Sequence, residues 1–209
     1  IPMTTREANV EGAGEVTMLD LLVNALRQRP DRLLVGEIRR QKEAEVLFEA
    51  MHTGHSVYAT LHADNAGDTI TRLINPPINI PKTMLDAIST IVVQFRHRRL
   101  GIRRVLEFAE VLKGGDVNVL YRWDLKSDTI KEINELSVLA DTLALYAGMT
   151  HQEIMESVGE KSKVLRWMLK HQVKSVDDTG LVIARYYTNP EEVMSIVNAD
   201  KPFDPETFW

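Results

Sequence analysis

The sequence contains no cysteine and no long apolar run. Its 209 residues can therefore form no disulfide framework, no thiolate nucleophile and no cysteine-ligated metal site. No stretch approaches the ~18 consecutive apolar residues of a membrane-spanning helix, and no secretory signal is present. A net charge of −5 argues against a dedicated nucleic-acid-binding domain, which is usually basic. The hydrophobic share of 44% is enough to build a core.

The sequence also lacks a Gly-Lys pair. The phosphate-binding loop G-x-x-x-x-G-K-[ST] holds phosphates with its backbone N–H groups and its lysine, and its hydroxyl binds magnesium. The chain as written therefore lacks the usual means of holding a triphosphate.

Two strand-like runs end in side chains that are able to do chemistry. The apolar residues 33–35 lead into Gly36 and Glu37, a pattern typical of a buried parallel strand. A second run, residues 56–61, is followed by His62. Open α/β sheets bind ligands at the carboxyl ends of their strands, so a carboxylate and an imidazole on adjacent strand ends form a candidate reaction centre. The alternatives are a solvent-facing turn residue for Glu37 and an ordinary loop residue for His62.

The order of the motifs resembles the secretion ATPases, a family that drives type II and type IV secretion, type IV pilus assembly and the archaeal flagellum-like filament. The motifs are ALRQRPD (25–31), the Walker B strand LLVGEIR (33–39), TGH (53–55) and the histidine box ATLHADNA (59–66). The resemblance covers residues 1 to about 125, and the remainder more loosely. The stretch TRLINPPINIP (71–81) and the lack of cysteine are most similar to the archaeal members.

This resemblance implies an α/β fold, namely the C-terminal half of a RecA-like P-loop ATPase sheet followed by a small helical domain. It also implies ATP and Mg²⁺ as cofactors, a hexameric ring, a membrane platform protein as partner at the inner face of the cell membrane, and no nucleic acid. In the family the P-loop precedes the region where this sequence opens, so we expect the C-terminal part of a longer ATPase. The alternative is a non-enzymatic assembly module that has lost nucleotide binding.

The resemblance also assigns roles to individual residues. Glu37 matches the carboxylate that ends the Walker B strand and orients the attacking water or accepts its proton. His62 matches the histidine-box position and would sense the γ-phosphate, or else only fix its loop through a hydrogen bond.

Weaker candidates for nucleotide binding or a subunit interface follow from the same motifs. Arg6 and Arg39 could complement phosphate charge or pair across subunits, and each is otherwise an ordinary surface arginine. Thr60 and His55 have loop or packing roles as their alternative. No metal site is predicted from the protein's own side chains.

The pattern of elements changes near residue 130. Residues 1–130 alternate helix and strand signals and end in an antiparallel hairpin, with strands at 103–112 and 117–123 around a Gly-Gly turn. Residues 131–209 show only helical periodicity. Its helices are expected at 136–146, 150–172 with a break near Gly159, 179–187 and 190–197, followed by an irregular tail from residue 200.

A basic run from Arg96 to Arg104 has no role in this scheme. Phe95 and Phe108 flank it and are expected in the core because they fall on strand periodicity. We favour a charged, aggregation-resistant sheet edge or a contact with an acidic neighbouring subunit over nucleic-acid binding.

Overall fold

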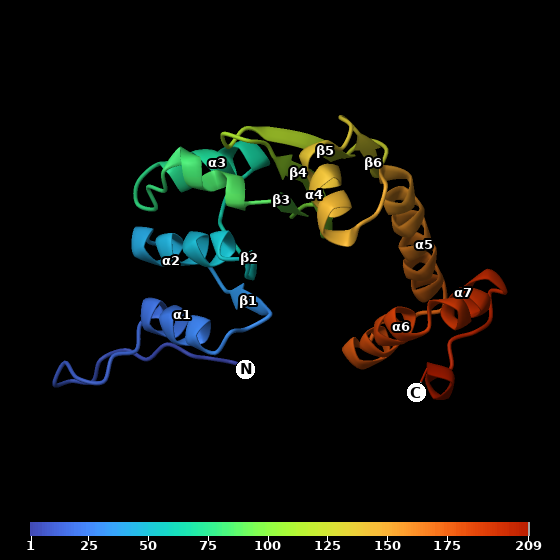
Figure 1. Ribbon diagram of the computed structural model, residues 1–209, viewed down its shortest axis with the longest axis horizontal. Coiled ribbons are helices and arrows are strands. Elements are labelled where there is room, and N and C mark those ends of the chain that lie inside the picture. Colours follow the sequence, from blue (N-terminus) through green and yellow to red (C-terminus); the bar gives the residue numbers. More distant parts are fainter. Residues whose placement is uncertain (209) are drawn as a thin grey trace. The chain divides into compact units, whose positions relative to one another are not determined.

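The computed structural model describes residues 1–208 (Figure 1). Its N-terminal part begins with helix α1 (Met18–Arg27), which starts at Thr17. The Thr17 hydroxyl accepts a hydrogen bond from the backbone N–H of Asp20, and the Asp20 carboxylate accepts one from the backbone N–H of Thr17. This reciprocal pair satisfies two N–H groups that a helix start would otherwise leave unbonded. Strand β1 (Arg32–Val35), helix α2 (Gln41–His52) and strand β2 (Ser56–Ala59) follow.

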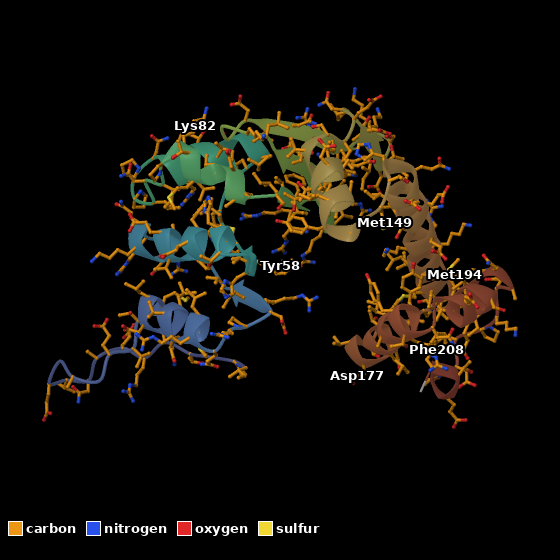
Figure 2. All side chains as sticks on the ribbon, viewed as in Figure 1. Tyr58, Lys82, Met149, Asp177, Met194 and Phe208 are labelled. Carbon is orange, nitrogen blue, oxygen red and sulfur yellow. The ribbon has the colours of Figure 1, made fainter. Side chains whose placement is uncertain are left out.

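β1 and β2 pair in parallel, with Leu33 opposite Val57 and Val35 opposite Ala59. Leu33 and Val35 are buried, whereas Leu34 is 79% exposed and Tyr58 on β2 is 60% exposed. Figure 2 labels the Tyr58 side chain. The two strands and their parallel pairing were predicted correctly. The prediction that β1 is a buried strand holds only for alternate residues, because packing within the described residues covers only one face of this pair.

The chain then forms helix α3 (Ala66–Ile74), the 3-10 helix η1 (Lys82–Ala87) and an antiparallel sheet of order β3-β4-β5-β6. The strands are β3 (Thr90–His97), β4 (Ile102–Val111), β5 (Val117–Asp124) and β6 (Thr129–Glu132). The predicted hairpin corresponds to β4 and β5. Strand β6 was not predicted, because its four residues are all exposed and give no hydrophobic alternation.

One apolar core joins both sheets of this first unit, Ile1–Leu139. Phe48 from α2, Leu73 from α3, Leu85 from η1 and Ala109 from β4 are all buried in it. The parallel pair and the antiparallel sheet therefore belong to one packed body, in which each strand end has a defined place.

The second unit starts at Ala140 and is helical. It contains most of α4 (Val138–Ala147), then α5 (His151–Lys170), α6 (Val176–Thr188), α7 (Pro190–Asn198) and the 3-10 helix η2 (Pro205–Phe208). No helix among residues 1–208 combines the length and the apolar character that a membrane crossing needs.

Two expectations about this unit were wrong. Helix α5 runs through Gly159 without a break, because one glycine costs only about 1 kcal/mol and buried residues such as Val164 and Trp167 hold the helix in place. The tail is not wholly irregular. Phe208 lies in η2 (Figure 2). It is buried against Trp167, with ring centroids 5.9 Å apart.

The division between the units falls after Leu139, nine residues beyond the expected boundary. Strand β6 pairs with β5, where Glu132 lies opposite Tyr121, and Ile133 N–H donates to the carbonyl of Leu120. These bonds tie residues 129–133 to the first unit.

The basic run lies around the turn between β3 and β4. Arg96 lies directly opposite Arg103, while Arg104 makes a paired contact with Asp128 (2.8 and 2.6 Å). Phe95 is 37% exposed and packs on Trp123, so its placement in the core was wrong. Strand periodicity shows which side chains share one face of a sheet, but it does not show whether another element covers that face.

Candidate functional site

Two hydrogen bonds join the residues that directly follow β1 and β2. The N–H of Ile38 donates to the carbonyl of Thr60 (3.0 Å), and the Thr60 hydroxyl donates to the carbonyl of Gly36. These two bonds bracket Glu37 and fix the start of the loop that carries His62.

Glu37 lies at the centre of a group of charges. Its Oε2 accepts from Arg39 Nε at 2.7 Å and lies 2.5 Å from Arg39 Nη2, and its Oε1 lies 3.4 Å from His62 Nε2. The Glu37 side chain is 21% exposed and that of His62 is 81% exposed. The carboxylate can therefore be reached from solvent, although charged groups surround it.

The pKa of Glu37 is lowered, chiefly by the hydrogen bond from Arg39. Partial burial raises it, and the charges of Arg39, His62 and Arg72 lower it further. Glu37 is therefore ionised at neutral pH and can only accept hydrogen bonds. A lowered pKa makes a weak base, since proton abstraction works best when the pKa lies near the working pH. The geometry thus suits orienting a water molecule better than removing its proton completely.

Glu37 faces a cavity of about 610 Å³ that is also lined by Arg6, Arg39 and Arg40. Arg6 belongs to a short ribbon in which it bridges to Val16, and its Nε donates to the carbonyl of Gly14 at 2.6 Å. This ribbon brings a third cation to the cavity of Glu37.

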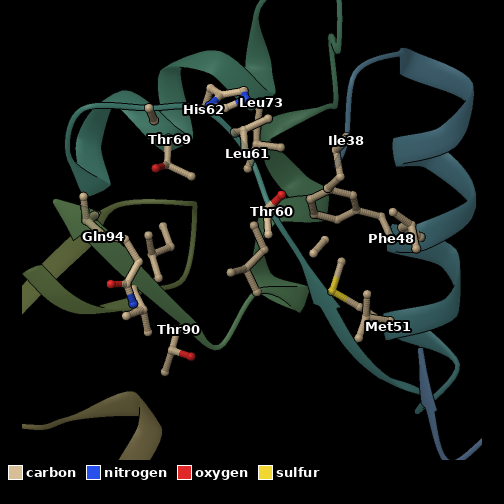
Figure 3. Close-up of a pocket in the computed structure, with 18 residues that line it drawn as sticks. Ile38, Phe48, Met51, Thr60, Leu61, His62, Thr69, Leu73, Thr90 and Gln94 are labelled. Atoms are coloured by element: carbon tan, nitrogen blue, oxygen red, sulfur yellow. The ribbon is translucent and has the colours of Figure 1, made fainter. Parts of the chain in front are cut away.

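Thr60 and His62 line a second cavity, of about 460 Å³ (Figure 3). Its other walls are mostly apolar, and Phe48 and Met51 reach into it from α2 (Figure 3). His62 therefore lies between the polar surroundings of Glu37 and an apolar hollow.

The remaining candidate lies elsewhere. His55 precedes β2, at the strand end opposite to Thr60, and its Nδ1 lies 3.2 Å from the carbonyl of Ala50 and 3.3 Å from the Thr53 hydroxyl. The structure thus gathers Arg6, Glu37, Arg39, Thr60 and His62 in one region and leaves His55 in a local turn.

Sequence reasoning missed Arg72, whose charge reaches Glu37 from α3. The available signal was its place in the helix that follows the histidine box. Within residues 1–208, no three His, Asp or Glu side chains come together closely enough to hold a metal ion.

Comparison with known proteins bears on this region directly. The family model described as "Type II/IV secretion system protein" matches residues 3–106, which include every candidate residue above. The type IV pilus assembly ATPase PilB of Thermus thermophilus is 34% identical over 169 residues, covering 68% of this chain. This chain belongs to the secretion ATPase family. The family and the α/β class with its helical C-terminal part, both expected from the sequence, are confirmed.

Two further similarities complete the comparison. An uncharacterized protein of Methanocaldococcus jannaschii is 35% identical over 175 residues, which are 80% of this chain. The crystal structure of the Legionella pneumophila ATPase DotB is 29% identical, over 45% of this chain and 27% of that one, with a TM-score of 0.38. The chain spans 64% of the length of the Methanocaldococcus protein and 18% of the Thermus PilB.

Proposed function

We propose that this chain supplies the catalytic-glutamate part of an ATP-hydrolysing motor for secretion or for pilus or archaeal flagellum assembly. The motor would be a hexameric ring that uses ATP and Mg²⁺ and acts on a membrane platform protein, at the inner face of the membrane. The observation that carries the proposal is the 3.4 Å approach of His62 to the ionised Glu37 at adjacent strand ends. Membership in a family that contains the PilB ATPases supports it.

The side chains around Glu37 meet some of the requirements of a nucleotide-binding site. Arg6 and Arg39 offer cations on the same cavity as Glu37, and guanidinium groups suit phosphate oxygens, whereas Glu7, Glu15 and Glu43 on that cavity carry the opposite charge. Magnesium in nucleotide sites takes one or two carboxylates and completes its shell with phosphate oxygens and water, so a three-carboxylate cluster is not required. Bound magnesium would neutralise charge that develops on the phosphates. The phosphate-binding loop itself is not among these 209 residues.

Within this scheme each residue has a distinct task. Glu37 orients the attacking water through a carboxylate oxygen, while Arg39 holds that carboxylate in place at 2.7 Å. His62 contacts the same carboxylate, and its proposed role is that of a sensor of the phosphate charge and not that of the group that activates the nucleophile.

A second candidate function is a non-enzymatic assembly module. Such a module would need no Gly-Lys pair, and residues 1–209 contain none. A loop ending in Gly-Lys-Ser or Gly-Lys-Thr, elsewhere in the protein that contains these residues, would favour the motor.

The test uses that whole protein, with the variant Glu37→Gln. Gln keeps the shape and one acceptor oxygen but removes the charge that orients the water, so ATP affinity should be retained while hydrolysis falls by roughly 10²-fold. Fluorescent-analogue binding and steady-state phosphate release measure the two effects. Glu132→Gln on the exposed strand β6 is the matched control. Hydrolysis near the wild-type rate in Glu37→Gln would return Glu37 to the role of a solvent-facing turn residue.

His62→Ala separates sensing from chemistry. It should leave nucleotide affinity close to wild type but uncouple hydrolysis from filament assembly or secretion. If instead assembly per ATP hydrolysed stays unchanged, His62 has no sensor role.

A further inference from the structure

A buried carboxylate on β4 reaches the loop that carries His62. Glu107 Oε2 accepts a hydrogen bond from the backbone N–H of Ala66 at 2.9 Å. Its Oε1 accepts from Arg122 Nε at 3.0 Å and lies 3.0 Å from Arg122 Nη2. The Glu107 side chain is only 7% exposed, whereas that of Arg122 on β5 is 51% exposed. A buried charge persists when it is paired and hydrogen-bonded, and Glu107 meets both conditions.

The Glu107 contact anchors the start of α3. Ala66 is the first residue of this helix, and its N–H is one of the groups that a helix start leaves without an intrahelical partner. Asn65 caps the same end by accepting from Asp68 N–H at 2.8 Å. A carboxylate is favoured at a helix N-terminus, where the helix dipole is positive. The antiparallel sheet therefore fixes where α3 begins.

The Glu107–Ala66 hydrogen bond and the two hydrogen bonds between the ends of β1 and β2 hold the His62 loop at its two ends. Thr60 is bonded to Gly36 and Ile38 on one side, and Ala66 is bonded to Glu107 on the other. Only five residues, 61–65, lie between them. His62 itself is largely exposed, so few contacts of its own can place it.

We propose that Glu107 is a positioning residue that holds His62 against Glu37, and that Arg122 orients the Glu107 carboxylate for this task. The proposal rests on the function proposed above for its catalytic meaning, but its geometric content can be tested without activity. A carboxylate suits the position because its two oxygens accept bonds in two directions at once, toward the loop and toward β5.

The test is an NMR double-variant comparison on residues 1–209. In the wild-type background, Glu37→Gln should shift the His62 ring resonances, because Glu37 Oε1 and His62 Nε2 lie 3.4 Å apart. In a Glu107→Ala background that shift should largely disappear. The Ala66 amide should also exchange with solvent about fivefold faster, as expected for loss of one hydrogen bond worth about 1 kcal/mol. Glu132→Ala is the control and should change neither readout.

Conservative variants separate positioning from general stability. Glu107→Gln retains an oxygen for Ala66 N–H but turns its NH₂ group toward the N–H donors of Arg122, so Glu107→Gln and Arg122→Gln should both weaken the His62 shift while Ala66 stays protected. These two variants also serve if Glu107→Ala does not fold. A full His62 shift in folded Glu107→Ala would overturn the proposal, and so would a full shift in both Glu107→Gln and Arg122→Gln.

Activity in the whole protein separates the two proposals. If Glu107→Ala abolishes the His62 shift but neither it nor His62→Ala affects ATP-coupled assembly, the positioning holds and the sensor role fails. If His62→Ala uncouples assembly while Glu107→Ala does not, the sensor role holds and the positioning fails.

Discussion

The most demanding stability prediction concerns Glu110, a fully buried carboxylate on β4. Its Oε1 accepts from Asn118 Nδ2 (2.7 Å), from Ser137 N–H (3.0 Å) and from the Ser137 hydroxyl (2.7 Å), and its Oε2 accepts from Leu139 N–H (2.8 Å). Burial raises the pKa of Glu110, but these hydrogen bonds outweigh it and the net pKa is lowered. The carboxylate thus ties the end of the first unit to β4.

Replacing Glu110 with Gln changes the balance of donors and acceptors. The amide oxygen can face the three donors from Asn118 and Ser137, but the amide NH₂ then faces Leu139 N–H, and two donors oppose each other without an acceptor. Each unsatisfied buried donor costs about 1–3 kcal/mol, so we expect Glu110→Gln to lower the free energy of unfolding by about 2–6 kcal/mol. Glu110→Ala leaves four donors unpaired and should cost more.

The free energy of unfolding is measured by urea titration at pH 7 with far-UV circular dichroism, and hydrogen exchange reports on the Leu139 amide. Because the folded-state pKa of Glu110 lies below its usual 4.5, its stabilisation is present above that pH and is lost as the pH falls through the folded-state value. The difference between wild type and Glu110→Gln should therefore shrink in acid. A difference within about 0.5 kcal/mol at pH 7, as for an ordinary surface substitution, would refute this reasoning.

Three further predictions follow from particular contacts. Gly114 and Gly115 both have positive φ, but only at Gly115 would an added Cβ meet the Leu85 side chain, at 2.6 Å. The free energy of unfolding of Gly115→Ala, measured by urea titration, should therefore be about 1–3 kcal/mol lower than that of Gly114→Ala. A hydrogen bond from Arg104 and a weaker effect of the one from Trp123 lower the pKa of Asp128 to about 2. The stability that ionised Asp128 contributes is therefore present above its unfolded-state pKa of 3.8 and is lost as the pH falls toward 2. Thermal unfolding of Asp128→Asn between pH 2 and 7 should lack that part of the acid dependence, and an unchanged profile would contradict it. Purified residues 1–209 should release no measurable phosphate from ATP, and turnover that Glu37→Gln abolishes would show that phosphates are held in another way.

The sequence by itself determined the features that depend on neighbouring residues. The Gly-Gly turn between β4 and β5 and the strand that leads into Gly36 and Glu37 were both predicted from short motifs. Each of these depends on local backbone geometry, which a few adjacent residues control. The family could be predicted for the same reason, because its motifs are short and their order is distinctive.

Only the tertiary structure decided how separated segments meet. Glu107 and Ala66 are 41 residues apart, Arg104 and Asp128 are 24 apart, and no periodicity pairs them. The exposed face of β1, the unbroken course of α5 and the burial of Phe208 also depend on what packs against each element. The sequence could name Glu37 and His62 as neighbours on adjacent strands. Their 3.4 Å contact depends on a loop held at both ends by bonds to distant strands, because an exposed side chain with few contacts of its own takes its position from the backbone that carries it.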